Sequence, residues 1–383
     1  MHHGRTRKVA VALSLSALVA CSHSGGHGAA EVDGPFRFLT TDNLAGQDDD
    51  PAVAVDANGT IHVVWFSDRD GTKDLWYVHS TALDLKSAAI GWSPPVHVTD
   101  LDAVNFPPPT QGDNYPALLV DADGSVNVAW HRWNLSNESH VLFLRCDGTP
   151  AGFAAATEIP VTSGAHFDRF PSLVRYAADD LRVYFGSSTR GTPGVNEIVM
   201  AQSSDDGATW SAPVLVPTLN AAGASEHSQF PSVARLGANS FVATLDRWAV
   251  GAGGDALDPT TDVFFGTSSD GETWTVDPVT NDPNDDVNDF VPELFFDHDG
   301  ATHLAWSTVG MGDPAADIVE VLASERAQYP ASAKLLSPLP GITDHSPRVV
   351  ALTVGGRRVY VMVWVRIVAG GANQVGYRVF TRL

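Results

Sequence analysis

Apolar residues fall into short runs separated by turn residues, and one sequence unit recurs along the chain. Each unit has a proline, an apolar run, often an Asp- or Gly-containing turn, and a second apolar run that usually ends in an aromatic residue. The units begin at Pro51, Pro116, Pro171, Pro231, Pro292 and Pro347. Because Asn, Asp and Gly tolerate the backbone of tight turns, each unit predicts a β-hairpin.

Two further runs follow each hairpin. The third runs start at Asp74, His140, Glu197, Asp262, Asp317 and Gln374. The fourth runs are shorter, carry Pro, Val or Thr, and start at Pro95, Ile159, Pro213, Asp277 and Leu335. The sixth unit lacks a fourth run because the chain ends at Leu383, but residues 35–42 (PFRFLTTD) have the composition of one.

This repeat predicts an all-β fold, a six-bladed β-propeller spanning residues 35–383. Four antiparallel strands form each blade, and the N-terminal strand closes the last blade. Such closure removes the exposed edges that an open β array would present. An elongated array is the alternative, but nothing in the sequence caps its ends.

The first 34 residues predict export rather than a part of the propeller. Three basic residues precede an apolar stretch, residues 9–20, that is too short to span a bilayer as a mature helix. The segment ending in Cys21 (LVAC) resembles the lipobox of bacterial lipoproteins, which implies cleavage after Ala20 and lipidation of Cys21. An ordinary signal peptide with a chance cysteine is the alternative. Residues 21–34 then form a flexible tether, and the expected location is the cell envelope, at the outer membrane or cell surface.

Composition limits the partners. The formal net charge of -22 argues against nucleic acid or an anionic membrane surface, so a lipid anchor is the only membrane contact we expect. With Cys21 lipidated, Cys146 would be the only free thiol of the mature chain, which excludes a disulfide framework. The 14 histidines form no recognisable metal-binding spacing, and no phosphate-binding glycine motif follows a strand. We therefore expect no cofactor and no metal, and a monomer.

Residues 203–210 (SSDDGATW) lie between the third and fourth runs of the third unit. Ser203, Asp205, Gly207, Thr209 and Trp210 have the spacing of the Asp box, so the chain resembles propellers of the sialidase superfamily (Asp-box or BNR repeats). Within such a turn the carboxylate can accept backbone N–H groups, and the glycine allows a positive φ. We expect a structural role for this segment, not a catalytic or calcium-binding one.

Two weaker copies of the motif follow from the same alignment. One covers residues 267–274, contains Gly271 and Trp274, and has Ser269 in the place of the aspartate. The other survives mainly as residues 91–94 (GWSP).

The resemblance implies that ligands bind on the face opposite the Asp boxes. Two columns of residues map to that face. Three positions before each proline stand Asp48, Asp113, Asp168, Ser228, Asp289 and Asp344. This column predicts either a cation-binding ring or repeated turn caps, and we favour the caps because Asp readily caps local backbone.

The second column lies just beyond the aromatic end of the second run. Its members are Ser67, Arg132, Ser187, Arg247, Thr308 and Arg366. Sialidases use three arginines around a substrate carboxylate, because a guanidinium pairs with a carboxylate through two parallel hydrogen bonds. The resemblance thus makes Arg132, Arg247 and Arg366 site candidates; ordinary surface or inter-blade pairing is the alternative. Further ligand-binding candidates are Arg69, Arg169, Trp133 and Trp248.

The catalytic machinery is less well defined. The loop of the first unit resembles the sialidase loop that carries the acid/base aspartate, which makes Asp68 and Asp74 candidates. The sialidase arginine two residues before the first proline is replaced by Asp49. No Tyr/Glu nucleophile pair can be placed; the options are Tyr377, Tyr360, Glu293 and Glu197.

Two hypotheses for the function remain. The first is an envelope-anchored, sialidase-like propeller that recognises a glycan, for instance an acidic one, with or without hydrolysing it; an active enzyme would resemble an exo-α-sialidase. The second is a non-catalytic binding or scaffold propeller for a protein or cell-wall partner.

Overall fold

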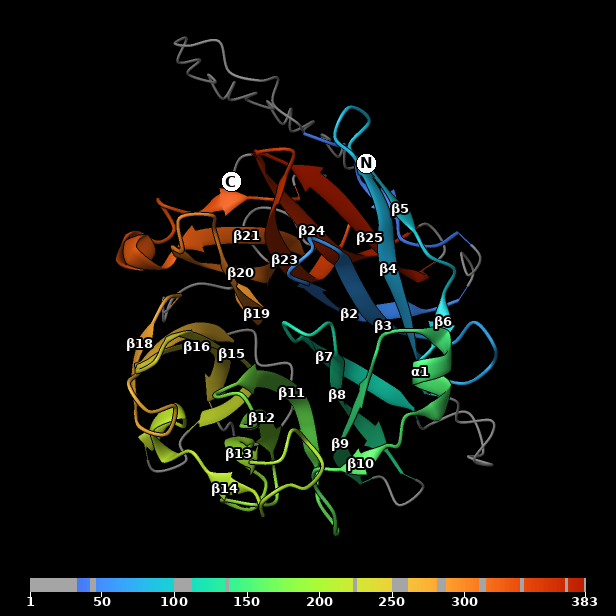
Figure 1. The fold of residues 1–383 in the computed structure, drawn as a ribbon. Helices are drawn as coiled ribbons and strands as arrows, with labels where there is room; N and C mark the ends of the chain where they lie inside the picture. The colour runs from blue at the N-terminus through green and yellow to red at the C-terminus, as the bar shows by residue number, and fades with distance from the viewer. Residues whose placement is uncertain are drawn as a thin grey trace, which may run out of the picture. The chain divides into compact units, whose positions relative to one another are not determined.

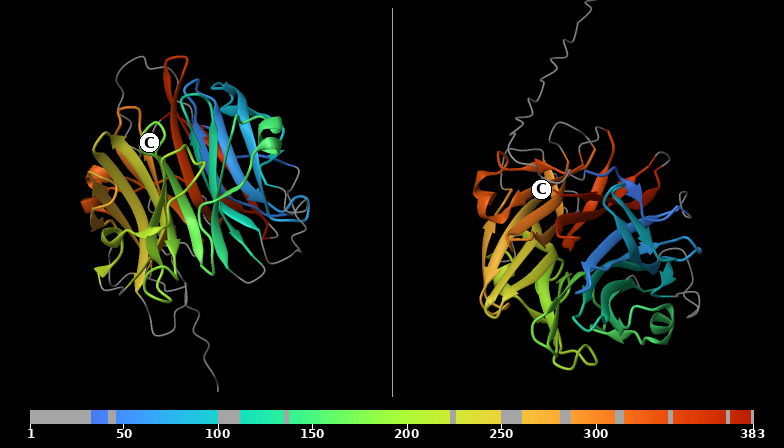
Figure 2. Two further views of the ribbon diagram at one scale, coloured as in Figure 1. Left: turned by 60° about the horizontal axis from the view of Figure 1, so that its bottom comes forward. Right: turned by 45° about the horizontal axis from the view of Figure 1, so that its top comes forward.

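A computed structural model of the chain describes residues 33–41, 46–99, 112–134, 138–222, 226–249, 261–280, 287–309, 315–337, 341–368 and 371–381. The predicted signal peptide and Cys21 lie outside the described residues. Residues 32–383 form one compact unit. Its strands make six antiparallel sheets around a central axis, as Figures 1 and 2 show. The predicted six-bladed propeller is confirmed.

The blades follow one another along the sequence. Blade 1 contains β2 (Asp48–Val55), β3 (Ile61–Ser67), β4 (Asp74–Asp84), β5 (Ala89–Trp92) and β6 (Val96–His97). Blade 2 contains β7 (Asp113–Val120), β8 (Val126–Trp133), β9 (Ser139–Cys146) and β10 (Ile159–Pro160). Blade 3 contains β11 (Asp168–Arg175), β12 (Leu181–Ser187), β13 (Glu197–Ser203) and β14 (Val214–Leu215).

Blade 4 contains β15 (Glu226–Gly237), β16 (Ser240–Ala249), β17 (Asp262–Ser268) and β18 (Trp274–Pro278). Blade 5 contains β19 (Asn288–Phe296), β20 (Thr302–Val309), β21 (Asp317–Leu322) and β22 (Lys334–Leu335). Blade 6 contains β23 (Asp344–Val354), β24 (Arg357–Ile367), β25 (Asn373–Phe380) and the N-terminal strand β1 (Arg37–Phe38).

The N-terminal strand closes the ring, as predicted. β1 pairs with β25, with Arg37 opposite Tyr377. Two details differ from the sequence prediction. Blade 1 gains β5, because β4 extends beyond the length of the other third strands and pairs with it. In blade 4, the fourth strand begins at Trp274, three residues before the predicted start at Asp277.

Helical segments are short and peripheral to the sheets. Among the described residues they are α1 (Pro150–Ala155), η2 (Pro217–Leu219) and η4 (Ala323–Gln328). Thr149 caps α1 by accepting a hydrogen bond from the Gly152 N–H, and a proline occupies the first turn. No helix among the described residues is long and apolar enough to cross a membrane.

The hydrophobic core is divided into six clusters, each between two neighbouring blades. The aromatic residues that end the second strands provide its largest side chains: Trp65, Trp130, Trp306 and Trp364 are fully buried. Aromatic side chains of this kind bury about 150–250 Å² each and dominate the energetics of a core. The recurrent aromatic that defined the sequence repeat is therefore the residue that packs blade against blade.

Residues 203–210 lie in the turn between β13 and β14. Asp205 accepts hydrogen bonds from the backbone N–H and the hydroxyl of Thr209, at 2.8 and 2.6 Å. Gly207 has a φ of +89°, and a Cβ there would lie 2.2 Å from the Phe143 ring of blade 2. Trp210 packs against that same ring. The turn thus fixes the contact between blades 2 and 3.

The second copy of the motif needs a correction. Asp270, not Ser269, occupies the aspartate position: it accepts hydrogen bonds from the Ser268 hydroxyl and the Thr273 N–H, at 3.0 and 2.7 Å. The turn is one residue shorter than in blade 3, which shifted the sequence alignment. In blade 1, Ser93 exchanges hydrogen bonds with the His79 backbone as Ser211 does with Gln202, so the third copy aligns as predicted.

Candidate functional site

The innermost strands β2, β7, β11, β15, β19 and β23 carry the repeated prolines. In each of them the pairing register shifts at the residue before the proline and the proline itself, which form a β-bulge. Proline suits this place because it cannot donate a ladder hydrogen bond. The residues three, two and one positions before each proline form three rows around the axis. We call them the first, second and third row.

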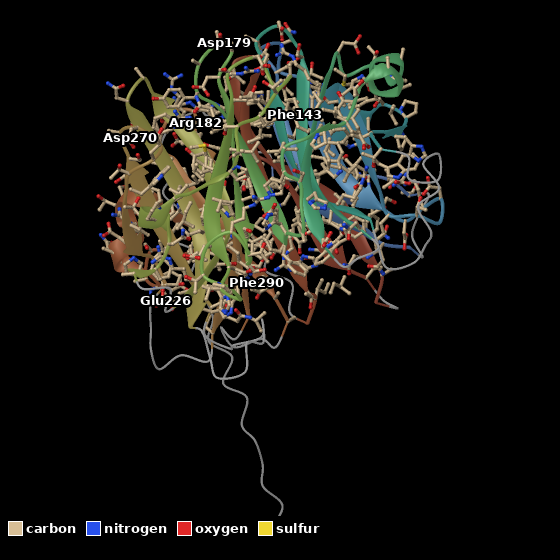
Figure 3. All side chains as sticks on the ribbon, turned by 90° about the horizontal axis from the view of Figure 1, so that it is seen from below. Phe143, Asp179, Arg182, Glu226, Asp270 and Phe290 are labelled. Carbon is tan, nitrogen blue, oxygen red and sulfur yellow. The ribbon has the colours of Figure 1, made fainter. Side chains whose placement is uncertain are left out.

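The two faces of the propeller follow from strand direction. The connections that lead into the innermost strands, and those between second and third strands, lie on one face, here called the mouth face. The turns between first and second strands, and those between third and fourth strands, lie on the opposite face, here called the turn face. In Figure 3, Glu226 and Phe290 lie at the mouth face, and Asp179, Arg182 and Asp270 at the turn face.

The first row is the predicted aspartate column, and its members are nearly inaccessible to solvent. Each residue of this row lies directly opposite a residue of the predicted arginine column: Asp113 opposite Arg132, and Asp344 opposite Arg366. The two columns are therefore one ring of cross-strand pairs.

This ring is neither the cation site nor the turn-cap series that the sequence predicts. Four of the aspartates pair with an arginine of their own blade: Asp48 with Arg69, Asp113 with Arg132, Asp168 with Arg190 and Asp344 with Arg366. Asp289 accepts a hydrogen bond from the Trp306 Nε1, at 2.9 Å. The turn-cap interpretation is therefore wrong. The interpretation fails because the hairpin register places the aspartate column opposite the arginine column.

The three candidate arginines have different surroundings. Arg132 forms two hydrogen bonds to Asp113, at 2.6 and 2.8 Å, and two more to Glu158. Arg366 forms two to Asp344, both at 2.7 Å. In blade 4 a serine stands in the first row, and the Arg247 guanidinium donates to the Leu219 carbonyl at 2.7 Å.

Arg247 makes no ion pair within the described part of the chain, and its Nε has no acceptor there. Burial lowers its pKa, opposed only by the charge of Glu226. Of the three arginines, only Arg247 thus keeps a cation that no carboxylate neutralises directly. The neighbouring Trp248 is buried and stacks on His227 with ring centroids 4.7 Å apart, so it contributes to packing.

The second row is half-buried and mostly polar. Its members are Asp49, Asn114, Arg169, Gln229, Phe290 and His345. Asp49 lies 4.0 Å from His345 and accepts a hydrogen bond from Asn373, both of blade 6. The Arg169 guanidinium lies over the rings of Trp133 and Phe170, at 5.6 and 5.2 Å, and burial lowers its pKa. Arg169 forms no ion pair with any residue that the structure describes.

The third row has a left-handed backbone. Its members are Asp50, Tyr115, Phe170, Phe230, Val291 and Ser346, with φ between +47° and +58°. Such angles are strained for residues other than glycine, more so before proline, and strain of this kind concentrates at functional sites. Side chains of the preceding blade hold three of the row's backbone N–H groups: His131 accepts from Phe170, Asp246 from Val291 and Ser307 from Ser346.

Aromatic side chains of the third row meet near the axis. Phe170 and Phe230 stack at 3.9 Å, and Tyr115 contacts both edge-on at 4.7 and 5.4 Å. A cavity of about 180 Å³ extends from this layer toward the turn face and is lined also by Glu293 and Arg348. Of the candidates predicted from the sequence, only Glu293, one of the options for the nucleophile pair, lines it.

Titratable groups from five blades interact around this layer, and we call them the axial cluster. Its members are Asp49, Asp50, Tyr115, Arg169, Glu293 and Arg348. Burial, reinforced by the charge of Asp49, raises the pKa of Asp50 well above its usual value. Burial and the two aspartates raise the pKa of Tyr115. Burial also raises the pKa of Glu293, although Arg348 lies 3.7 Å away.

Asp246 is a further buried carboxyl near the third row. Its Oδ2 accepts the Val291 N–H at 3.2 Å, whereas its Oδ1 has no hydrogen bond among the described residues. Burial raises its pKa well above the usual value, so the carboxyl is neutral over a wider pH range than an exposed aspartate.

Of the predicted catalytic candidates, only the nucleophile option Glu293 belongs to the axial cluster. Asp68 accepts a hydrogen bond from the Gln47 N–H at 2.8 Å, and Asp74 accepts one from the Thr72 hydroxyl at 2.5 Å. Of the tyrosine options, Tyr377 is bound to the backbone of Ile90. Sequence reasoning missed Asp50, Tyr115 and Asp246. The signal that could have found the first two is their shared position directly before the repeated proline.

Comparison with known proteins gives structural matches only. No protein-family model matches the sequence, and no curated protein matches it significantly. A protein of unknown function from Dyadobacter fermentans is 16% identical, with a TM-score of 0.63 over 91% of this chain and 99% of that one. An α-L-arabinanase of Penicillium chrysogenum, solved with arabinobiose, is 12% identical, with a TM-score of 0.59 over 92% and 98%. A sialidase of Streptococcus pneumoniae is 10% identical, with a TM-score of 0.55 over 91% of this chain and 70% of that one. The chain therefore has the sialidase-like six-bladed propeller fold, shared with arabinan-degrading enzymes.

Proposed function

We propose that the protein binds a glycan at the mouth of the propeller channel and hydrolyses a glycosidic bond there. The axial cluster is the observation that carries this proposal. Five blades contribute charged or phenolic groups to one region, although burying such groups is costly unless they serve a purpose.

The chemistry of the cluster suits glycoside hydrolysis. That reaction needs one carboxyl group that stays protonated and a second that is ionised. The raised pKa of Asp50 makes it the proton donor, and the adjacent Asp49 provides the second carboxylate. The arabinobiose-bound structure of the P. chrysogenum arabinanase supports a glycan as the ligand.

Arg169 and Trp133 form the glycan-binding surface in this proposal. An indole ring offers a face for sugar stacking, and a guanidinium without a counter-ion attracts a carboxylate. An acidic sugar is therefore the preferred ligand. Arg247, which likewise makes no ion pair with a described residue, is the second candidate for this contact.

A binding protein without hydrolytic activity is the second candidate function. Two observations favour it over a sialidase. Asp49 occupies the position of a sialidase arginine, and Arg132 and Arg366 are already paired with aspartates. These features weaken the sialidase mechanism, but they leave the surface around Arg169 intact.

One set of variants separates the two functions. The purified protein is assayed against chromogenic glycosides, including an α-L-arabinofuranoside and an α-sialoside, and against a glycan array. We expect Asp50→Asn to abolish hydrolysis while binding persists, and Arg169→Ala to weaken binding. Arg358→Ala, on an exposed arginine of the turn face, is the matched control. Binding without hydrolysis in the parent protein would establish the second function, and the absence of both would refute the proposal.

The proposal includes a lipid anchor at the cell envelope, which the lipobox-like sequence at Cys21 supports. Radiolabelled palmitate should label the parent chain but not Cys21→Ser. Equal labelling or equal membrane retention of both would exclude the anchor.

A further inference from the structure

Three potential metal ligands meet in blade 1, away from the axial cluster. A carboxylate oxygen of Asp70, one of Asp74 and a ring nitrogen of His97 all lie within 4.8 Å of one another. Asp70 and Asp74 flank the connection between β3 and β4, and His97 lies on β6. Asp74 was a candidate for catalysis only, because the histidine is remote in the chain and joins the two aspartates through strand pairing.

Strand pairing fixes the histidine. β6 pairs with β4 so that His97 lies opposite Trp76, and the two rings touch edge-on with centroids 3.8 Å apart. The Arg69 guanidinium lies over the Trp76 ring at 4.7 Å. The imidazole therefore belongs to a packed layer and does not rotate freely.

The carboxylates are oriented by the loop between them. Gly71 adopts a φ of +103°, which turns the chain back after Asp70. The Thr72 hydroxyl donates to Asp74 at 2.5 Å and lies 3.5 Å from Asp70. Asp74 is fully buried, whereas Asp70 is exposed. One ligand is thus anchored in the blade and another faces solvent, which leaves an entry path for an ion.

The contact between Asp70 and His97 is not a satisfied hydrogen bond. The Asp70 Oδ2 lies 2.7 Å from the His97 Nε2, yet this nitrogen is shielded from solvent and makes no hydrogen bond of acceptable geometry to a described residue. Buried ring nitrogens normally find a partner along the direction of their lone pair or N–H. The Nε2 thus faces the Asp70 carboxylate without an aligned hydrogen bond, and an ion coordinated by both groups would satisfy the two atoms.

We propose that Asp70, Asp74 and His97 bind a divalent transition-metal ion, with Zn²⁺ preferred. One nitrogen and two carboxylate oxygens suit Zn²⁺ or Mn²⁺, whereas Ca²⁺ and Mg²⁺ favour oxygen ligands alone. Water would complete the coordination on the side of Asp70. The bound ion would tie the connection between β3 and β4 to the outer strand of blade 1.

Metal titration of the untagged full chain tests the site. The protein is stripped with EDTA, dialysed and titrated calorimetrically with Zn²⁺, Mn²⁺, Ca²⁺ and Mg²⁺. Because histidines also stand at positions 2, 3, 23 and 27, the difference between variants is decisive rather than the total. We expect the parent chain to bind one Zn²⁺ more than His97→Ala and Asp70→Asn do.

Matched controls come from the turn face. His298→Ala and Asp299→Asn remove the same side-chain types there and should bind as the parent does. Asp70 is exposed, so Asp70→Asn should fold even if variants of the buried Asp74 do not. Equal Zn²⁺ stoichiometry and affinity in the parent, His97→Ala and Asp70→Asn would overturn the proposal.

Thr72 provides a test of positioning. Its hydroxyl contacts a ligand but not the proposed ion, and loss of such a partner weakens metal sites by roughly 10- to 100-fold. Thr72→Val should therefore weaken Zn²⁺ binding, and Thr72→Ser should restore it. If Thr72→Val binds Zn²⁺ as tightly as the parent, the proposed arrangement of ligands is wrong.

Discussion

Arg132 and Arg247 stand in nearly the same local sequence, but only Arg132 is paired with carboxylates. Each precedes a tryptophan at the end of a second strand, in HRW and DRW. Arg132 is held by Asp113 and Glu158, whereas Arg247 is held by a backbone carbonyl. The difference lies in the cross-strand partner, which is Asp113 in blade 2 and Ser228 in blade 4.

This comparison shows how a repeated position can serve two purposes. Where the first row supplies an aspartate, the arginine is neutralised within its own blade and stabilises the hairpin. Where the first row supplies a serine, the cation keeps its capacity to attract an anion. Within such a column, an arginine is therefore left without a carboxylate partner on the facing strand only where the facing residue is not acidic.

The largest expected effect is on stability, at a paired arginine. Arg366→Ala leaves the Asp344 carboxylate buried and unpaired, which should lower the free energy of unfolding by about 3–5 kcal/mol. Urea unfolding monitored by tryptophan fluorescence measures this loss. Replacing both partners, as Arg366→Leu with Asp344→Leu, should cost much less. A single variant as stable as the parent would show that the pair is not structural.

The second effect concerns pH and the carboxyl beside Arg247. Burial raises the pKa of Asp246 above its usual 3.8, so the folded state binds this proton more tightly than the unfolded state. The resulting stabilisation is complete below pH 3.8 and is lost as the pH rises through the pKa of the folded state. Asp246→Asn remains neutral and can still accept the Val291 N–H.

We therefore expect the stability of Asp246→Asn relative to the parent to increase between pH 4 and pH 8. Melting temperatures of both proteins across this range provide the measurement. Other titrating groups cancel in the difference. A difference that does not change with pH would mean that Asp246 is ionised in the folded protein throughout.

The smallest expected effect comes from a substitution that gives blade 4 the aspartate–arginine arrangement of blade 2. Ser228→Asp places a carboxylate opposite Arg247, as Asp113 stands opposite Arg132, and a charged hydrogen bond contributes roughly 1–3 kcal/mol before desolvation is subtracted. We expect a small net change in stability and weaker binding of an acidic glycan. Ser228→Asn, without the added charge, is the control. Undiminished binding in Ser228→Asp would exclude Arg247 from the site.

The fold could be predicted because every blade repeats the proline and most repeat the turn and the aromatic, so an error at one blade is corrected by the others. The first row and the arginine column were both found, but their pairing was missed, although it follows from counting outward from the hairpin turn. The left-handed third row could not be predicted, because a residue before proline normally favours an extended backbone. Tyr115, Asp50 and Asp246 acquire their electrostatic character from burial near the axis, which single-sequence patterns do not report.

The third row lets the side chains at the centre of the propeller vary while the backbone stays the same. Each blade places one side chain, Asp, Tyr, Phe, Phe, Val or Ser, on the same strained backbone, and the bulge that holds it is built by the blade and not by that side chain. One residue can then be exchanged without altering the sheet behind it. Six such positions surround one axis. In the proposed function, substitutions at single positions would change the groups that face a ligand without changing the strands that carry them.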